Sequence, residues 1–520
     1  MMTALLALLA CSNAPVDSAG GGDTRDVIDD ATTLGPVHPC DAPLPTVSYT
    51  EVGAAMGLLA APDPDGPHAE GGSVAVLDVD YDGDLDAVIV YENHAPYLYR
   101  RDGDTFAVET INGVQSPWLL GLTDINADGR LDLLVGGRPP YVLLGDGVGF
   151  GAPTALATLT GDEPGNVAKT LAPGDLDRDG AIDIYAVVNS GSDDGTGLLR
   201  ADFVLWNDGA GAFTEAPQRA PASSEGRGFD AQVLEWQGQR AIYVANDMGP
   251  QYGGNALFTV DGRTLVDQND ACACGIEHSA MGHDVGDWNA DGLADIYVAA
   301  TPFNTLLTAQ PDGTFVDVAA AVGAQGIKEQ ANLGMAWGAA FLDYDNDGHV
   351  DILDPQGDNW FRDQENPPIL PQPIWMLRQV DGRFEEVSAS LGLAQLGSFR
   401  SVSAEDHNGD GVLDLLVTEV IAPPKFYLSN GCTADSWIEV AAPIDSRVEV
   451  TAGGRTQTAW AQTHMGYGGA RAPVVHVGLG AEQSVEQILV TTPQGVVYRV
   501  DGPIDARRRV FVGEPPGVLR

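Results

Sequence analysis

The stretch that decides the fold is Asp78-Val-Asp80-Tyr-Asp82-Gly83-Asp84-Leu-Asp86, followed directly by the apolar run Ala-Val-Ile-Val. It has the form D-x-[DN]-x-D-G-x-x-D, and the same form begins again at residues 124, 175, 287, 343 and 406. Each copy leads into an apolar segment typical of a buried β-strand. We number these copies loops 1 to 6 in chain order.

The gap between loops 3 and 4 is about twice the others, which predicts a degenerate copy inside it. Val233-Leu-Glu235-Trp-Gln237-Gly238 keeps the glycine and a following apolar strand but lacks the aspartates. Each unit also carries an Asp-Gly hairpin turn, such as Asp312-Gly313 before Phe315. Several short strands per repeat predict an all-β, seven-bladed β-propeller followed by a small C-terminal β-domain. A linear array of separate calcium modules is disfavoured, because the apolar strands need neighbours to bury them.

The loops carry the chemistry of a calcium site. Aspartate at positions 1, 3, 5 and 9 offers hard oxygen ligands, glycine at position 6 permits a sharp turn, and a backbone carbonyl at position 7 completes the set. Position 12 holds no glutamate, so these are not EF-hands, and without cysteine in the loops Zn²⁺ is disfavoured. We expect about six Ca²⁺ ions that mainly stabilise the fold. The predicted ligands are Asp78, Asp80, Asp82, Asp84, Asp86, Asp124, Asn126, Asp128, Arg130, Asp132, Asp175, Asp177, Asp179, Ala181, Asp183, Asp287, Asn289, Asp291, Leu293, Asp295, Asp343, Asp345, Asp347, His349, Asp351, Asp406, Asn408, Asp410, Val412 and Asp414.

Composition limits the possible partners. The chain has 520 residues and a formal net charge of −48, so its surface repels nucleic acid and anionic lipid. It contains 64 glycines and 33 prolines, which favours many turns over a helical bundle. Without bound cations the clustered carboxylates repel one another.

The N-terminus is predicted to be a targeting segment. Residues 1–10 are too short an apolar stretch to span a bilayer and suit a signal peptide. Leu8-Leu9-Ala10-Cys11 resembles a bacterial lipobox, so Cys11 is the predicted lipidation site; a plain signal peptide is the alternative. Residues 11–45 are poor in large apolar side chains and are predicted to be a flexible tether. We therefore expect an exported lipoprotein of the outer membrane or cell surface of a bacterium, held to the membrane only by its lipid.

The loops and their following strands resemble the FG-GAP/VCBS repeats of integrin α-subunit propellers. This resemblance spans roughly residues 47–430 of the predicted propeller, residues 46–431, and implies a seven-bladed ring that binds Ca²⁺ in such loops. The degenerate unit departs from the pattern, and its calcium site is expected to be lost.

A separate small β-domain is predicted at residues 435–515. Arg447-Val448-Glu-Val450 and the run Val475–Gly480 resemble the ASPIC/UnbV domain. Thr492-Pro493-Gln494-Gly495 stands where that family usually has Trp-Pro-Ser-Gly. The combination is similar to the cartilage acidic protein family and its bacterial relatives, an architecture for which the resemblance implies no established catalytic activity.

The order of the pieces predicts how the ring closes. The last unit lacks an outer strand, and residues 47–52 have the sequence of one. We expect this segment to complete the last blade and remove an open edge. Cys40 and Cys432 flank the two strands, so a Cys40–Cys432 disulfide is predicted to fasten the closure.

The remaining cysteines form the pair Cys272-Ala-Cys274. With His278 and His283 nearby, a transition-metal or redox site is one interpretation. A loop disulfide beside unrelated histidines is the favoured one, since an exported chain favours paired cysteines.

Two function classes are left. We expect a monomeric binding or adhesion protein that holds an extracellular protein or glycan through loops on a propeller face. The long loop at 355–375, with Trp360 and Trp375, is the predicted ligand-binding insert. A propeller-fold polysaccharide lyase or hydrolase is the alternative, although the sequence has no G-x-S-x-G, H-E-x-x-H or Walker motif.

Overall fold

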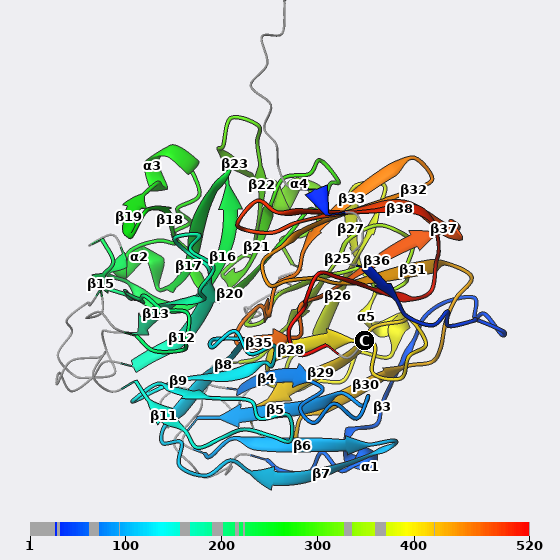
Figure 1. Ribbon diagram of the computed structural model, residues 1–520, viewed down its shortest axis with the longest axis horizontal. Coiled ribbons are helices and arrows are strands. Elements are labelled where there is room, and N and C mark those ends of the chain that lie inside the picture. The colour runs from blue at the N-terminus through cyan, green and yellow to red at the C-terminus, as the bar shows by residue number, and fades with distance from the viewer. Residues whose placement is uncertain are drawn as a thin grey trace, which may run out of the picture.

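Antiparallel four-stranded sheets arranged around a centre make up most of the computed structural model (Figure 1). The structure describes residues 27–28, 32–61, 72–92, 94–156, 167–189, 201–213, 218–221, 224–326, 335–358, 371–420 and 422–518. Within these ranges every helix is a single turn, and no helix has the length and apolar character needed to cross a membrane. The fold is therefore all-β, and it is a β-propeller followed by a small β-region.

In each blade the strands follow one another along the chain, except that β3 is the fourth strand of the last blade. The blades are β4 (Gly72–Leu77), β5 (Asp86–Tyr91), β6 (Tyr97–Asp102) and β7 (Thr105–Thr110); β8 (Pro117–Thr123), β9 (Asp132–Gly137), β10 (Tyr141–Leu143) and β11 (Thr154–Ala155); β12 (Val167–Gly174), β13 (Asp183–Asn189), β14 (Phe203–Leu205) and β15 (Gln218–Arg219); β16 (Arg227–Trp236), β17 (Gln239–Asp247), β18 (Ala256–Asp261) and β19 (Thr264–Asp267); β20 (Ser279–Gly286), β21 (Asp295–Thr301), β22 (Thr305–Ala309) and β23 (Phe315–Asp317); β24 (Ala340–Leu342), β25 (Asp351–Pro355), β26 (Ile374–Val380) and β27 (Arg383–Glu386); and β28 (Phe399–Glu405), β29 (Asp414–Glu419), β30 (Lys425–Ser429) and β3 (Tyr49–Glu51).

Neighbouring blades also touch through their strand ends. Ala168 pairs with Gly137, and Asn189 pairs with Arg227. These single pairs join β8–β19 into one 12-stranded sheet. Because the sheets merge in this way, the number of seven blades stays a prediction.

The last blade closes as the sequence predicts. β3 pairs antiparallel with β30, with Tyr49 opposite Ser429 and Glu51 opposite Tyr427. The Cys40–Cys432 disulfide is present beside this closure. N-terminal residues therefore supply the outer strand of the blade that the end of the repeat region begins, and both predictions are confirmed.

A short helix follows the outer strand in four of the blades. These helices are α1 (Gly53–Met56), α3 (Asn269–Cys272), α4 (Ala319–Val322) and α5 (Ser388–Leu391), while α2 (Gly249–Tyr252) follows β17. A Cβ at Gly392, after α5, would lie 2.5 Å from the Tyr49 carbonyl oxygen, and one at Gly57, after α1, would lie 2.7 Å from that of Phe106. The same close contact therefore runs from β27 to β3 and from β3 to β7, across the point where the ring closes.

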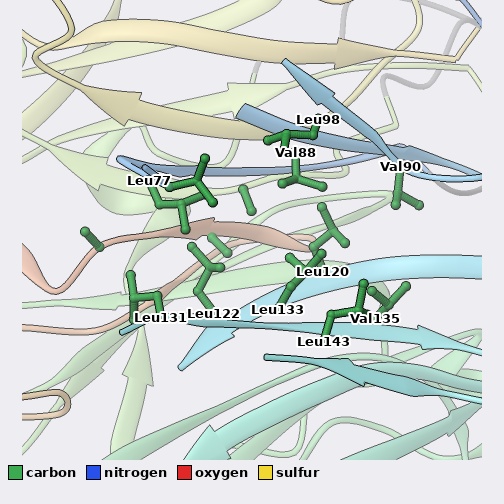
Figure 2. Close-up of a cluster of buried hydrophobic side chains, with 14 of the residues drawn as sticks. Leu77, Val88, Val90, Leu98, Leu120, Leu122, Leu131, Leu133, Val135 and Leu143 are labelled. Carbon is green, nitrogen blue, oxygen red and sulfur yellow. The ribbon is translucent and has the colours of Figure 1, made fainter. Parts of the chain in front are cut away.

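Apolar side chains fill the space between blades. Figure 2 shows Leu77, Val88 and Leu98 of the first blade facing Leu120 and Leu133 of the next. All five are at most 3% exposed. Strand residues of both faces are buried because each blade packs between two others, which explains the continuous apolar runs after the loops.

The C-terminal region forms two further sheets. One has the order β1 (Val27–Ile28), β38 (Val497–Asp505), β37 (Ser484–Thr491), β32 (Arg447–Ala452) and β33 (Arg455–Trp460); the other has the order β2 (Thr32–Leu34), β39 (Arg509–Val512), β31 (Ser436–Ala441) and β36 (Val474–Gly480). A shared core of valine, isoleucine and alanine lies between them.

This region does not fold apart from the propeller. The hairpin of β34 (His464–Met465) and β35 (Gly469–Arg471) adds to the first blade, where β35 pairs parallel with β4. β35 lies at the centre of the ring beside β4, β8 and β28 (Figure 1). Tyr467, at the tip, packs against Phe229 and Trp337. The expected separate domain therefore extends its glycine-rich hairpin into the middle of the propeller.

Part of the predicted tether is also ordered into sheets. β1 pairs with β38 and β2 pairs antiparallel with β39, so residues 27–28 and 32–34 are not a free linker. The average composition of residues 11–45 did not indicate the two short segments that form β1 and β2. Edge strands of two or three residues need little apolar surface when a partner strand is already in place.

Candidate metal-binding loops

All six acidic loops lie at the same edge of the propeller. Each connects the first strand of a blade to the second, as loop 1 connects β4 to β5 and loop 5 connects β24 to β25. The first strands of neighbouring blades contact one another around the centre. The repeat therefore gathers the predicted ligands, from residue 78 to residue 414, on one face.

Position 1 folds each loop around its own carboxylate. The backbone N–H of the position 6 glycine donates to the position 1 aspartate in every loop, at 2.7–3.2 Å. Gly83 makes this bond with a left-handed φ of 98°, which a side chain disfavours. The loop is thus held in a turn that places its carboxylates close together.

Position 9 has a role that the sequence pattern did not indicate. One oxygen accepts the position 2 backbone N–H at 3.0–3.4 Å in all six loops. The other accepts a backbone N–H from the third strand or from the second residue after it, at 2.7–2.9 Å. This aspartate therefore ties the loop to its blade, whether or not it also binds an ion.

Burial makes the charged form of these carboxyls costly. It raises the pKa of Asp86, Asp132, Asp183 and Asp414 to about 7, and that of Asp295 to about 8, against the lowering effect of the backbone hydrogen bonds. Burial together with neighbouring aspartates also raises the pKa of Asp343. A bound divalent cation would offset this cost.

Three of the loops bring acidic oxygens within 4.8 Å of one another. They are the loops with aspartate at position 3, which we call the D-x-D loops: loops 1, 3 and 5. The clusters are Asp78, Asp80 and Asp86; Asp175, Asp177 and Asp183; and Asp343, Asp345 and Asp347.

In each D-x-D loop an arginine contacts the position 3 carboxylate. The pairs are Arg100 with Asp80 at 3.0 Å, Arg263 with Asp177 at 2.8 Å and Arg378 with Asp345 at 2.8 Å. The repeat pattern does not indicate these arginines, because they follow their loops at varied distances. A usable signal was present: two of them stand in the third strand, just before the Asp-Gly hairpin.

The D-x-D loops also hold buried oxygens that lack a partner. Asp80 Oδ1, Asp175 Oδ1, Asp343 Oδ1 and Asp345 Oδ1 accept no hydrogen bond. Asp175 is 2% exposed and Asp343 is 6% exposed, so water does not satisfy them freely. Unpaired buried carboxylate oxygens of this kind fit a hard cation.

In loops 2, 4 and 6, which we call the D-x-N loops, a nearby side chain donates a hydrogen bond to the position 5 aspartate. The amide of Asn126 donates to Asp128 at 3.1 Å, and that of Asn289 donates to Asp291 at 2.9 Å. In loop 6 the hydroxyl of Ser429 donates to Asp410 at 2.9 Å. All residues of these three loops are described, and none of their carboxylate oxygens is both buried and without a partner.

The C-terminal region covers the loop face. In loop 2 the Gly129 carbonyl accepts from the Gly517 N–H at 3.0 Å, and in loop 3 Asp175 accepts from the Gln494 amide. In loop 5 the Asn346 carbonyl accepts from the Gly480 N–H at 2.8 Å. In loop 6 Trp437 packs on Gly411. A ligand held by this face would have to share it with the C-terminal sheets.

The degenerate copy and the cysteine pair are structural. Residues 233–241 run through a tight turn between β16 and β17. Cys272 and Cys274 form a disulfide, which confirms the favoured interpretation. His283 is buried beside Asp230 and Tyr243, whereas His278 is half-buried and contacts Phe303, so the two histidines do not share a site with the cysteines.

Two other predicted sites lie wholly or partly outside the described residues. Cys11 and Trp360 fall in segments that the structure does not describe. Trp375 is described and lies in strand β26, half-buried against the cluster that contains Phe341 and Phe384. Its position is that of a blade side chain and not of a loop tip.

A propeller with repeated acidic loops at one face defines the class of protein. Family models match here: an FG-GAP-like repeat at residues 78–135, 124–186 and 287–353, and ASPIC and UnbV at residues 440–517. The chain therefore carries FG-GAP-like repeats and an ASPIC and UnbV region, as the sequence analysis inferred. A propeller of such repeats indicates a binding or adhesion protein.

Among curated proteins the chain is similar to cartilage acidic protein 1 of Homo sapiens, with 24% identity over 498 residues, covering 78% of this chain and 72% of that protein. Among solved structures it is similar to BBS1N in complex with ARL6DN, with a TM-score of 0.42, 10% identity and coverage of 74% and 97% of the two chains. It is also similar to the Dos1 propeller, with a TM-score of 0.40, 9% identity and coverage of 68% and 77%.

Proposed function

We propose that this chain is an exported, calcium-stabilised binding or adhesion protein, anchored through a lipid on Cys11. The observation that carries the calcium assignment is the set of buried, unpartnered carboxylate oxygens in the D-x-D loops. The two disulfides support an oxidising compartment outside the cytoplasm.

Calcium fits the donors better than other metals. The described loops offer carboxylate, amide and backbone oxygens and no cysteine, which is the ligand set of a hard cation. A bound ion would supply positive charge that joins the first and second strands of a blade. We propose about six such ions, with the D-x-D loops binding most tightly.

The ligand is proposed to bind at the face opposite the loops. The C-terminal sheets occupy the loop face, and the hairpin around Tyr467 fills the centre. Connections between second and third strands, such as residues 248–255 and 302–304, form the other edge of the blades. An extracellular protein or glycan is the proposed partner, and the acidic chain is proposed to act as a monomer.

A thermal melt of the full mature chain tests the calcium assignment. We expect EDTA to lower the melting temperature strongly, and Ca²⁺ but not Zn²⁺ to restore it. Each ion at 100 times its Kd stabilises the fold by ~2.7 kcal/mol, so several ions contribute as much as the whole stability of an ordinary domain. An unchanged melting temperature in EDTA would rule out stabilising ions in these loops.

A further inference from the structure

Gln494 links the C-terminal sheets to loop 3. It stands in the turn between β37 and β38, where the Gly495 N–H donates to the Thr492 carbonyl. Its side-chain amide donates to Asp175 Oδ2, across 319 residues of sequence. The side chain of a distant region is thus directed into a metal-binding loop.

Loop 3 has few oxygens left for an ion. Asp183 already accepts two backbone hydrogen bonds, from Leu176 at 3.2 Å and Asn207 at 2.9 Å. Asp177 accepts from Arg263 at 2.8 Å and from the Asp179 N–H at 3.2 Å. Asp175 Oδ1 is buried without a partner. Since Ca²⁺ takes six to eight oxygen ligands, loop 3 is short of them.

We propose that Gln494 is a calcium ligand of loop 3, which makes this a metal site shared between the propeller and the C-terminal region. The proposal rests on the proposed function and names a ligand outside the repeat. A glutamine carries one carbonyl oxygen and one NH₂ group at the same reach, and a half-turn of the amide exchanges them. Without an ion, the NH₂ group of Gln494 donates to Asp175. With an ion bound, the amide turns and its carbonyl oxygen becomes the ligand.

The neighbouring blade gives an ion access to loop 3. The degenerate copy between β16 and β17 has only a tight turn at Gln237 and Gly238, where other blades have an acidic loop. A hollow of about 530 Å³ opens there, lined by Asp177, Gly238 and Arg240 among others. Loss of one repeat's loop thus leaves room beside Asp177, one of the loop 3 carboxylates.

The test compares Gln494→Ala and Gln494→Glu with the parent chain. Full-length proteins are dialysed against a series of free Ca²⁺ concentrations, and bound calcium per chain is measured by mass spectrometry of the metal. We expect Gln494→Ala to weaken one ion by roughly tenfold, ~1.4 kcal/mol. Gln494→Glu should bind that ion at least as tightly as the parent, because a carboxylate replaces the amide oxygen.

Two controls make the result specific. Gln487→Ala removes a similar bond, from Gln487 to Asp501 at 2.9 Å, in the same sheet and should leave calcium binding unchanged. Asp175→Asn should remove the same ion, so adding Gln494→Ala to it should cause no further loss. Melting temperatures in EDTA check that each variant folds.

The competing role for Gln494 is a hydrogen bond alone. Glutamate cannot donate that bond at neutral pH, so Gln494→Glu would then lose as much calcium as Gln494→Ala, and the proposal would be overturned. Unchanged calcium binding in Gln494→Ala would overturn it as well. A parent chain that binds no calcium would instead refute the proposed function.

Discussion

Loops 4 and 5 follow the same backbone course and differ at position 3. In loop 4 the Asn289 amide donates to Asp291 at 2.9 Å, so a neighbouring carboxylate is satisfied from within the loop. In loop 5 Asp345 contacts Arg378 through one oxygen and leaves the other buried and unpaired. One carboxylate in place of one amide thus separates a loop whose buried carboxylate oxygens all have partners from a loop with a buried oxygen that has none.

The residue at position 3 gives one repeat pattern two kinds of loop. An amide brings two N–H donors and no charge, which lowers repulsion among the aspartates. A carboxylate adds an oxygen ligand and a charge, and each D-x-D loop has an arginine that partly balances the charge. The propeller alternates these solutions along the chain, since loops 1, 3 and 5 are D-x-D and loops 2, 4 and 6 are D-x-N.

The largest expected effect comes from the position 1 aspartates. In millimolar calcium, Asp343→Asn in loop 5 should lower the free energy of unfolding by about 3 kcal/mol, because a tightly bound ion is lost. Asp287→Asn in loop 4 should lower it by less than about 1 kcal/mol. Urea denaturation of both variants measures the two values, and equal losses would break the comparison.

The next largest effect is expected in the pH dependence of stability without calcium. Burial raises the pKa of Asp86, Asp132, Asp183 and Asp414 to about 7 from 3.8, so between these values the folded state binds more protons than the unfolded state. Stability in EDTA should therefore fall as pH rises from about 4 to 7. Calcium should abolish the fall. Thermal melts at pH 5 and pH 7.5, with and without calcium, check this.

Two buried histidines oppose this trend. Burial lowers the pKa of His283 to about 4, and burial together with Arg101 lowers that of His407 to about 3, from 6.5 in both cases, so these residues make the fold more stable as pH rises toward 6.5. They are two groups against several carboxyls. A rise of melting temperature with pH in EDTA would show that the loop carboxyls do not dominate.

A smaller effect is expected from the arginine partner. Arg378→Gln removes a cation that contacts Asp345 at 2.8 Å and Asp347 at 2.9 Å. The calcium-free protein should lose about 0.5–1 kcal/mol, while the gain on adding calcium should increase because less positive charge repels the ion. Arg499→Gln, whose partner Asp501 is exposed, serves as the matched control. Melting temperatures in EDTA and in calcium give both quantities.

The smallest effect should come from converting a D-x-N loop. Asn126→Asp in loop 2 adds a ligand oxygen and removes the donor to Asp128. We expect tighter binding of one ion and, in EDTA, a loss of about 0.5 kcal/mol from added repulsion. Asn112→Asp adds the same charge at an exposed turn and should change neither. Dialysis of the two variants against calcium measures whether one ion binds more tightly.

Local patterns made the propeller predictable from the sequence. The D-x-[DN]-x-D-G loops, the strands after them and the spare outer strand at residues 47–52 each carry their signal within about ten residues. The Cys40–Cys432 disulfide followed from that closure. The division between D-x-D and D-x-N loops was visible in the sequence, but its meaning depends on arginines that fold next to the loops from elsewhere.

Contacts between distant regions were not predictable in the same way. No periodicity indicates that Gln494 meets Asp175, that Tyr467 enters the ring, or that Val27 pairs with Val497. These contacts join segments hundreds of residues apart, and a single sequence records them only as ordinary polar, aromatic or apolar residues. Only the structure therefore shows that the C-terminal region covers the loop face.

The pairing of β1, β2 and β3 with strands near the other end of the chain sets the order of assembly. A polypeptide that crosses a membrane unfolded and N-terminus first delivers residues 27–51 well before their partners at 425–512. In such a polypeptide, these early segments would stay without partner strands until translocation is almost complete. A product that stops before residue 497 lacks the partner strand of β1. The edge of β1 then stays exposed to chaperones and proteases.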